Sequence, residues 1–195
     1  MSYLTSEFDS RIVEILKHGG IGFMPSDTVY GLSALAANKL AVKKIHTIKS
    51  RSYHRPFIVL ISDISQLEEL GISINDAEPA FKYWPGPLSI ICPAAAPEYL
   101  ELGTGSLAVR LPDNEELIRL VDRTGPLIST SANLEGQETV HTVEEAREIF
   151  GDKLDFYVDA GEIDSKVSTI IKVQGDTLEV IRQGAVKIDK KKGLE

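Results

Sequence analysis

The sequence predicts an α/β domain in which helices pack on a twisted sheet of mixed parallel and antiparallel strands. Helical and strand-like patterns alternate along most of the 195 residues, which is typical of parallel strands joined by helices. Near the C-terminus, two strand-like runs flank Gln174-Gly175-Asp176, and this spacing indicates an antiparallel hairpin. The chain has no internal repeat and no Gly/Ser-rich linker. We therefore expect one domain over residues 1–186, followed by a tail over 187–195.

In the first half of the chain, apolar periodicity and helix-breaking residues mark the elements. A helix is expected over residues 5–18, where apolar residues recur at helical spacing and Gly19 follows. A short strand over 21–24 ends at Pro25. The further elements expected here are, in order, a helix over 38–48, a strand over 57–61, a short helix capped by Asp63, a helix that begins at Asn75 with Glu78 completing a capping box, and a strand over 88–92.

The second half of the chain continues the alternation. Asp113 opens a helix that ends near Gly125. Thr142 and Glu145 form a capping-box pattern before a helix that ends at Gly151. The strands expected here cover residues 107–111, 127–130, 156–158, 169–173 and 178–181.

Composition excludes several classes of protein. The formal net charge of −8 argues against a protein that coats nucleic acid. The single cysteine, Cys92, excludes an internal disulfide framework and fits a reducing compartment. No apolar run is long enough to span a membrane, and the N-terminus has no signal-peptide pattern. We therefore expect a cytoplasmic protein with a buried thiol and no membrane partner.

One block of the chain is basic although the whole chain is acidic. No acidic residue lies between Asp27 and Asp63, whereas six Lys or Arg residues do: Lys39, Lys43, Lys44, Lys49, Arg51 and Arg55. A solvated helix face explains the first three. The last three run directly into a predicted core strand, and this placement indicates a localised anion site.

Small polar side chains gather where predicted strands end. Residues 126–136 read PLISTSANLEG, so three hydroxyls and an amide follow a buried strand directly. Because ligands bind at strand ends in open α/β sheets, we expect these side chains and Arg110 to face a ligand. Two simpler readings stay open: Arg110 as an edge-strand residue that points to water, and Thr28 as a turn hydroxyl only.

Familiar catalytic motifs are missing from the sequence. There is no GxxxxGK[ST] or GxGxxG pattern, so a phosphate site here would be held by side chains rather than by a glycine-rich loop. No Cys/His cluster has metal-ligand spacing, and no Ser/His/Asp order is evident. Arg and Lys with many small donors suit phosphates, which favours catalysis by positioning and charge neutralisation.

Seven segments in this order resemble the YrdC/Sua5 family of threonylcarbamoyl-AMP synthases. The matching segments are MPSDTVYGL, KSRSYHRPFIVLI, YWPGPLSII, LAVRLPD, PLISTSANLEG, VSTIIKV and EVIRQG. Together they span about residues 20 to 186. The resemblance implies a YrdC-like fold with a concave, basic face, in the short form that lacks the extra C-terminal domain of longer members.

The resemblance also implies a reaction. L-threonine and bicarbonate give N-carboxythreonine, which attacks the α-phosphate of ATP and yields threonylcarbamoyl-AMP and pyrophosphate. A separate transferase complex then moves the threonylcarbamoyl group to tRNA, forming the modified nucleoside t6A. Mg²⁺ would enter with ATP as substrate, with no tightly bound cofactor and no metal held by the protein.

The family's site residues map onto this chain position by position. The resemblance implies that Lys49 and Arg51 of a K-x-R motif are catalytic and neutralise the ATP phosphates. Arg55 takes the place of a usual Asn beside the nucleotide. The other ATP-binding positions are Ser106, Ser131, Asn133, Thr139 and Arg182. The threonine-binding positions are Thr28, Arg110, Ser129 and Ser168.

The chain departs from the family pattern in three further places. The family often has PTET where this chain has PSDT, so Asp27 replaces a Glu. Leu60 stands where some members carry a His that faces the amino acid, and Val167 replaces a Glu before Ser168. These departures leave open a paralogue of the same fold with a different acyl-adenylate substrate.

Two alternatives belong to other classes. An RNA-binding module for tRNA or double-stranded RNA could use the same basic concavity, but the net charge of −8 and the lack of interleaved aromatics argue against it. A carbamoyl-adenylate-forming relative, as found inside hydrogenase-maturation proteins, would bring zinc-finger cysteines that this chain lacks.

Overall fold

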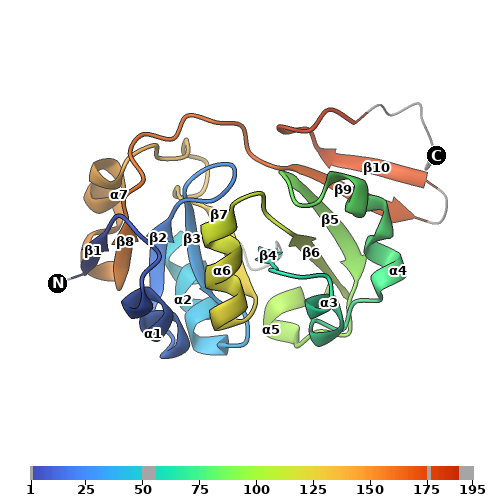
Figure 1. Cartoon of the computed structure of the whole chain (residues 1–195), viewed down its shortest axis with the longest axis horizontal. Coiled ribbons are helices and arrows are strands. Elements are labelled where there is room, and N and C mark those ends of the chain that lie inside the picture. Colours follow the sequence, from blue (N-terminus) through green and yellow to red (C-terminus); the bar gives the residue numbers. More distant parts are fainter. Residues whose placement is uncertain (1, 50–55, 175–176, 189–195) are drawn as a thin grey trace.

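The computed structural model describes residues 2–49, 56–174 and 177–188. Within these ranges the strands join in one sheet that crosses the whole molecule (Figure 1). The strands are β1 (Tyr3–Thr5), β2 (Ile21–Met24), β3 (Gly31–Leu35), β4 (Ile58–Leu60), β5 (Leu88–Pro93), β6 (Ser106–Arg110), β7 (Leu127–Ser131), β8 (Phe156–Val158), β9 (Thr169–Gln174) and β10 (Thr177–Arg182).

The sheet is mixed, as the sequence predicts. Its order is β1-β8-β2-β3-β7-β4-β6-β5-β9-β10. The pairs β1/β8, β2/β8, β4/β6 and β5/β9 are parallel, whereas β2/β3, β3/β7, β4/β7, β5/β6 and β9/β10 are antiparallel. The predicted C-terminal hairpin is confirmed by the antiparallel pairing of β9 with β10, although residues 175–176 at its turn lie outside the described residues.

Helices connect the strands and cover the sheet (Figure 1). They are α1 (Ser10–Lys17), α2 (Lys39–Lys49), α3 (Gln66–Glu69), α4 (Ile74–Ala77), α5 (Glu98–Glu101), α6 (Glu115–Thr124) and α7 (Val143–Phe150), with 3₁₀ turns at Glu78–Tyr83 and Gly151–Lys153. Side-chain caps set four of the starts. Asp9, Asn38, Asn114 and Thr142 accept hydrogen bonds from the backbone N–H groups of the first turns of α1, α2, α6 and α7.

Four features of the expected elements differ from the structure. Asp63 does not cap a helix, because α3 begins at Gln66 with Ser65 at its N-cap and has no side-chain cap. The first helix begins at Ser10 rather than at residue 5, because residues 3–5 pair with β8 as a strand and Asp9 is the cap. No capping box forms at Asn75: α4 starts at Ile74, has no side-chain cap and continues as a 3₁₀ turn. Strand β3 was missed because its sequence, GLSAL, has few strand-favouring residues.

Apolar side chains form two clusters. The smaller cluster joins α1 and α6 through Ile12, Leu16 and Leu120 to the sheet residues Leu60 and Leu127. The larger cluster gathers the remaining buried apolar side chains, those of α2 and α7 among them. Cys92 is buried as expected, and burial raises the pKa of its thiol to about 12. In the described part of the chain, no helix is both long enough and apolar enough to cross a bilayer.

The register of three central strands places the polar motifs at one edge of the sheet. Ile58 of β4 pairs with Ser129 of β7 on one side and with Ala108 of β6 on the other. Two residues further toward this edge, β7 ends at Ser131 and β6 begins at Ser106. Neighbouring strands lie about 4.8 Å apart, so these two serines stand roughly 10 Å apart across β4.

Candidate active site

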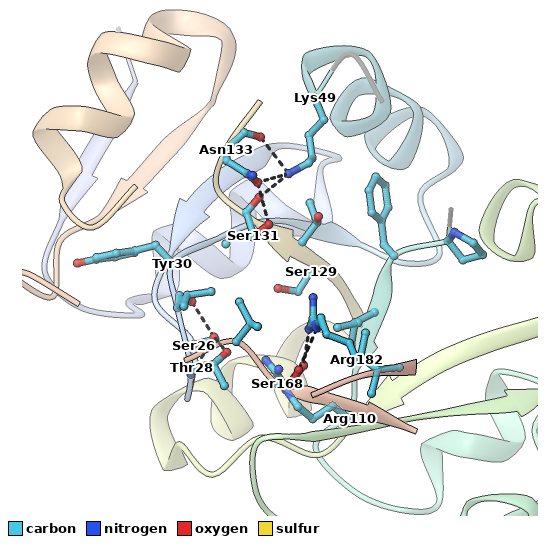
Figure 2. Close-up of a pocket in the computed structure, with 18 of the residues that line it drawn as sticks. Ser26, Thr28, Tyr30, Lys49, Arg110, Ser129, Ser131, Asn133, Ser168 and Arg182 are labelled. Atoms are coloured by element: carbon cyan, nitrogen blue, oxygen red, sulfur yellow. Dashed lines mark hydrogen bonds between the residues drawn. The ribbon is translucent and has the colours of Figure 1, made fainter. Parts of the chain in front are cut away.

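A cavity of about 250 Å³ is lined by residues of β3, β7, β4, β6 and β9 (Figure 2). Its walls come from the loop after β2, the end of α2, the end of β7 with the loop after it, and the start of β9. Among the described lining residues, Lys49, Arg110 and Arg182 are cationic and Glu135 is the acidic one. This excess of positive charge agrees with the anion site expected from the acid-free block.

Lys49 is buried although it lines the cavity. Lys49 is the last residue of α2 and is only 3% exposed. The ammonium donates to the carbonyl oxygen of Ser131 at 2.6 Å, to that of Asn133 at 2.9 Å and to Asn133 Oδ1 at 2.8 Å. An ammonium has three hydrogens to donate, and at least these three protein oxygens accept from it. Lys49 therefore anchors the loop after β7 and places a positive charge behind it.

The amide of Asn133 organises the same loop. Its Oδ1 accepts from Ser131 Oγ at 2.8 Å as well as from Lys49, and its Nδ2 donates to the carbonyl of Gln137 at 2.6 Å. Because an amide oxygen can only accept, the Ser131 hydroxyl gives its proton to Asn133. In this arrangement Ser131 presents lone pairs to its surroundings, and the loop is closed on itself by side chains.

Arg110 and Asp27 form a buried ion pair. Arg110 Nη2 lies 3.0 Å from Asp27 Oδ1, and the two side chains are 4% and 2% exposed. Asp27 Oδ2 also accepts from the backbone N–H of Asp113 at 3.2 Å. Among the described residues, neither Asp27 Oδ1 nor Arg110 Nε has an aligned hydrogen-bond partner. The close contact between the two side chains is therefore mainly an electrostatic attraction.

This ion pair excludes one reading of the sequence. Arg110 does not point to water from an edge strand, because β6 lies between β4 and β5 and the side chain is buried. Burial lowers the pKa of the Arg110 guanidinium, and the neighbouring Asp27 charge opposes that effect. A buried cation with an unpartnered Nε at the wall of the cavity is a donor held in place for an anionic or carbonyl oxygen.

The loop after β2 closes the cavity on the side of β3. Ser26 Oγ donates to the carbonyl of Val29 at 2.8 Å and lies 3.0 Å from Thr28 Oγ1. Thr28 is buried and lines the cavity, and its carbonyl accepts a hydrogen bond from the Ser165 hydroxyl. The loop that carries Thr28 therefore joins the cavity wall to the segment between β8 and β9, and the Thr28 hydroxyl contacts Ser26 of the same turn.

On the opposite side, Arg182 of β10 holds Ser168. Its Nε donates to the Ser168 carbonyl at 3.1 Å and its Nη2 donates to Ser168 Oγ at 3.0 Å (Figure 2). Because the guanidinium donates two hydrogen bonds to the same residue, the positions of Arg182 and Ser168 are fixed relative to each other. Ser168 and Arg182 thus form one rigid corner of the cavity.

Most of the site residues expected from the sequence meet in this cavity. The expected residues that line it are Thr28, Lys49, Arg110, Ser129, Ser131, Asn133, Ser168 and Arg182. Thr139 and Ser106 do not line it. Thr139 lies in the loop after β7, next to Val140, whose N–H bonds to Ala132, and Ser106 stands at the same sheet edge across β4. Arg51 and Arg55 lie outside the described residues.

Sequence reasoning missed several residues that build the site. Nothing in the sequence indicated that Asp27 pairs with Arg110, yet it is the counter-charge of that residue. Gly31 lies against the hydroxyl run, because a Cβ there would stand 2.9 Å from Ser129 Oγ. Ser89 was hidden inside an apolar strand and contacts Ser168. A lone polar residue in a buried strand is the only signal that could have found it.

The departures Leu60 and Val167 also have defined places. Leu60 is fully buried in the cluster with α1 and α6 and does not line the cavity. Val167 does line it. Where a His and a Glu would have offered polar groups, this chain therefore has a core side chain and an apolar stretch of wall. In the described residues, no group of three or more His, Cys, Asp or Glu could hold a metal ion.

Comparisons with known proteins agree with this geometry. A family model for Sua5, YciO and YrdC proteins, described as "Telomere recombination", matches residues 14–184. A protein of Methanocaldococcus jannaschii, named as a candidate threonylcarbamoyl-AMP synthase, is 34% identical over 194 residues, which cover 96% of this chain and 92% of that protein. The threonylcarbamoyl-AMP synthase of Bacillus subtilis is also 34% identical, over 91% of this chain and 53% of its own length.

A solved structure shows the same fold with an amino acid bound. The Sua5 protein of P. abyssi in complex with L-threonine superposes with a TM-score of 0.82 at 30% sequence identity. The match covers 89% of this chain and 53% of that chain. The sheet described above therefore belongs to a known architecture.

Proposed function

This chain belongs to the family of Sua5, YciO and YrdC proteins, and we propose that it is an L-threonylcarbamoyl-AMP synthase. It joins L-threonine, bicarbonate and ATP into threonylcarbamoyl-AMP and pyrophosphate, the activated group from which t6A in tRNA is made. The observation that carries this function is the cavity itself. Buried cations and small hydroxyls, with no metal-binding cluster among the described residues, suit a reaction promoted by positioning and charge.

The chemistry requires two anions to meet. The amino nitrogen of threonine takes up a carboxylate from bicarbonate, with loss of water, to give N-carboxythreonine. A carbamate oxygen then attacks the α-phosphorus of ATP, and the bond from that phosphorus to the bridging oxygen of pyrophosphate breaks. The protein must bring a carboxylate and a triphosphate together, so its main task is to offset their repulsion.

The amino acid occupies the side of the cavity formed by Thr28, Arg110, Ser129 and Ser168. These residues come from four separate segments, yet all four line the same cavity (Figure 2). Arg110 is the cation of this group and is buried, so it interacts with a carboxylate in a low dielectric. The apolar wall at Val167 faces the same space.

The nucleotide occupies the side formed by Lys49, Ser131, Asn133 and Arg182. Lys49 contributes its charge through the loop that it anchors, since its ammonium donates to three oxygens of that loop. Ser106 and Thr139 are the outer contacts of this side. The phosphate contacts expected of Arg51 and Arg55 fall on residues outside the described ranges. Mg²⁺ enters with ATP, and a separate transferase complex takes the product to tRNA.

The decisive experiment measures pyrophosphate release from ATP and bicarbonate, with and without L-threonine. Release that depends on L-threonine, with much slower release for L-serine, is the expected result. ATP binding without threonine-dependent release would overturn the proposal and point to a paralogue with another substrate, as the apolar residues at positions 60 and 167 would allow. Steeply salt-dependent RNA binding without any turnover would favour the RNA-binding alternative.

Gly31→Ala tests the amino-acid side of the cavity. The new methyl group would stand 2.9 Å from Ser129 Oγ and 3.1 Å from the Thr130 carbonyl, so the Ser129 hydroxyl must turn away. We expect the KM for L-threonine to rise about fivefold to tenfold, the effect of one lost hydrogen bond, with the KM for ATP unchanged. Steady-state kinetics check this, and an unchanged threonine KM would contradict the assignment of Ser129.

A further inference from the structure

A buried serine outside the cavity touches the cavity wall. Ser89 of β5 is 0% exposed, and its hydroxyl oxygen lies 3.1 Å from that of Ser168. Ser168 is 1% exposed and also accepts a hydrogen bond from Arg182 Nη2 at 3.0 Å. Among the described residues, the Ser89 hydroxyl has one hydrogen-bond partner, which is Ser168. Hydrogen bonds thus connect Ser89 in the core, through Ser168, to Arg182 at the cavity.

The direction of the bond between the two serines follows from counting protons. A guanidinium only donates, so Ser168 Oγ accepts from Arg182. If Ser168 donated to Ser89, the Ser89 proton would be buried without an acceptor, at a cost of about 1–3 kcal/mol. If Ser89 donates to Ser168, both hydroxyls are used and the Ser168 proton remains for the cavity. The second arrangement is therefore the stable one.

Backbone contacts hold Ser168 in place while its hydroxyl could still rotate. The N–H of Thr169 donates to the Pro87 carbonyl at 3.0 Å, and the N–H of Ala185 donates to the Val167 carbonyl at 3.0 Å. Gly184 packs so closely that a Cβ there would lie 2.2 Å from the Val167 carbonyl. The backbone thus fixes where Ser168 is, and Ser89 and Arg182 decide which way its proton points.

We propose that Ser89 is a positioning residue that fixes Ser168 as a hydrogen-bond donor to an acceptor oxygen of the bound amino acid. Two acceptor directions of the Ser168 oxygen are occupied by Ser89 and Arg182, so the hydroxyl proton is directed to the remaining side, which is the cavity. The role assigned to Ser168 rests on the proposed function. The polarity of the Ser89–Ser168 bond does not, and it can be tested separately.

The test uses the full chain with Ser89→Ala, Ser168→Ala and the double variant. We expect Ser89→Ala to raise the KM for L-threonine about fivefold to tenfold, with kcat and the KM for ATP nearly unchanged. In the Ser168→Ala background, Ser89→Ala should raise the threonine KM no further, because Ser89 acts through Ser168. Ser89→Thr, which keeps the hydroxyl, should keep the wild-type KM.

Thermal unfolding supplies a readout that does not depend on activity. Ser168→Ala leaves the Ser89 proton buried without an acceptor, so its Tm should fall. The double variant removes both groups and should have a higher Tm than Ser168→Ala alone. Ser89→Cys, which is close to serine in size but donates weakly, repeats the kinetic test without a cavity and should behave like Ser89→Ala.

Ser33→Ala is the matched control. Ser33 is also a buried serine in a central strand, at 1% exposure, but within the described structure its hydroxyl has no hydrogen-bond partner and it does not line the cavity. Its removal should leave the threonine KM unchanged and should not lower the Tm.

Two kinetic results would overturn the proposal: an unchanged threonine KM in both Ser89→Ala and Ser89→Cys, or an equal further rise in the Ser168→Ala background. A double variant no more stable than Ser168→Ala would contradict the inference that Ser89 donates its hydrogen bond to Ser168. If the wild type releases no pyrophosphate with L-threonine, the proposed function fails, and the order of Tm values still decides the polarity of the Ser89–Ser168 hydrogen bond.

Discussion

Asp27→Asn is expected to destabilise the protein by about 3–5 kcal/mol, because it leaves the Arg110 guanidinium buried without a counter-charge. Both side chains are almost fully excluded from solvent, so water cannot replace the lost carboxylate. Asparagine keeps the size of the side chain and can still accept from the Asp113 N–H, which isolates the effect of charge. Chemical denaturation of wild type and variant measures the difference in unfolding free energy.

The same substitution should weaken the amino-acid site. Without Asp27, Arg110 loses its orientation, and we expect the threonine KM to rise roughly tenfold to hundredfold, the range for a hydrogen bond to a charged group. Asp27→Glu keeps the charge and should recover most of the stability. The double variant Asp27→Asn/Arg110→Met removes both charges and should be more stable than Asp27→Asn alone. A loss below about 0.5 kcal/mol for Asp27→Asn would show that the ion pair is not desolvated.

Lys49→Met is expected to lower kcat/KM about a hundredfold or more. Methionine has a similar length but no hydrogens to donate, so the carbonyls of Ser131 and Asn133 and the Asn133 amide lose their shared partner. Displacement of a positioning loop by about 1 Å can cost a hundredfold in rate. We also expect a loss of about 2–3 kcal/mol in unfolding free energy, because buried acceptors are left unpaired.

Lys44→Met is the control for this prediction. Lys44 lies on the same helix, but its side chain is 58% exposed and its Nζ stands 4.0 Å from the partly exposed Asp155. An exposed ion pair contributes little, so the variant should stay within about 0.5 kcal/mol of wild type and keep full activity. Comparable kinetics for Lys49→Met and Lys44→Met would show that the loop after β7 does not depend on the ammonium.

The elements that the sequence predicted well are those whose signal is local. The strand Ile21–Met24 and the helix that ends at Gly125 follow from apolar periodicity and breaking residues, and both were found at the expected places. β1 and β3 escaped prediction for a different reason. Tyr3–Thr5 is a strand because β8 pairs with it, and GLSAL is a strand because β2 and β7 enclose it. Pairing partners that are distant in the sequence overrode weak local preference.

In the candidate site, too, some properties could be predicted from the sequence and others could not. Its chemical character could be read from the sequence, since Lys49, Arg110 and the hydroxyl run Ser129–Thr130–Ser131 were all expected near an anion. Their hydrogen-bond directions could not be read. Lys49 gives its hydrogens to the loop, and Ser131 gives its proton to Asn133. Such details depend on atomic distances that are set only when separate strands come together.

The sequence by itself determined the mixed α/β class, the positive character of the site and most of the residues that line the cavity, because side-chain type and local periodicity are properties of short segments. Only the tertiary structure decided that Asp27 neutralises Arg110 and that Ser89 reaches Ser168 from another strand. The cost of burying a charge or a hydroxyl depends on what lies within about 3 Å, and that neighbour can be tens of residues away along the chain.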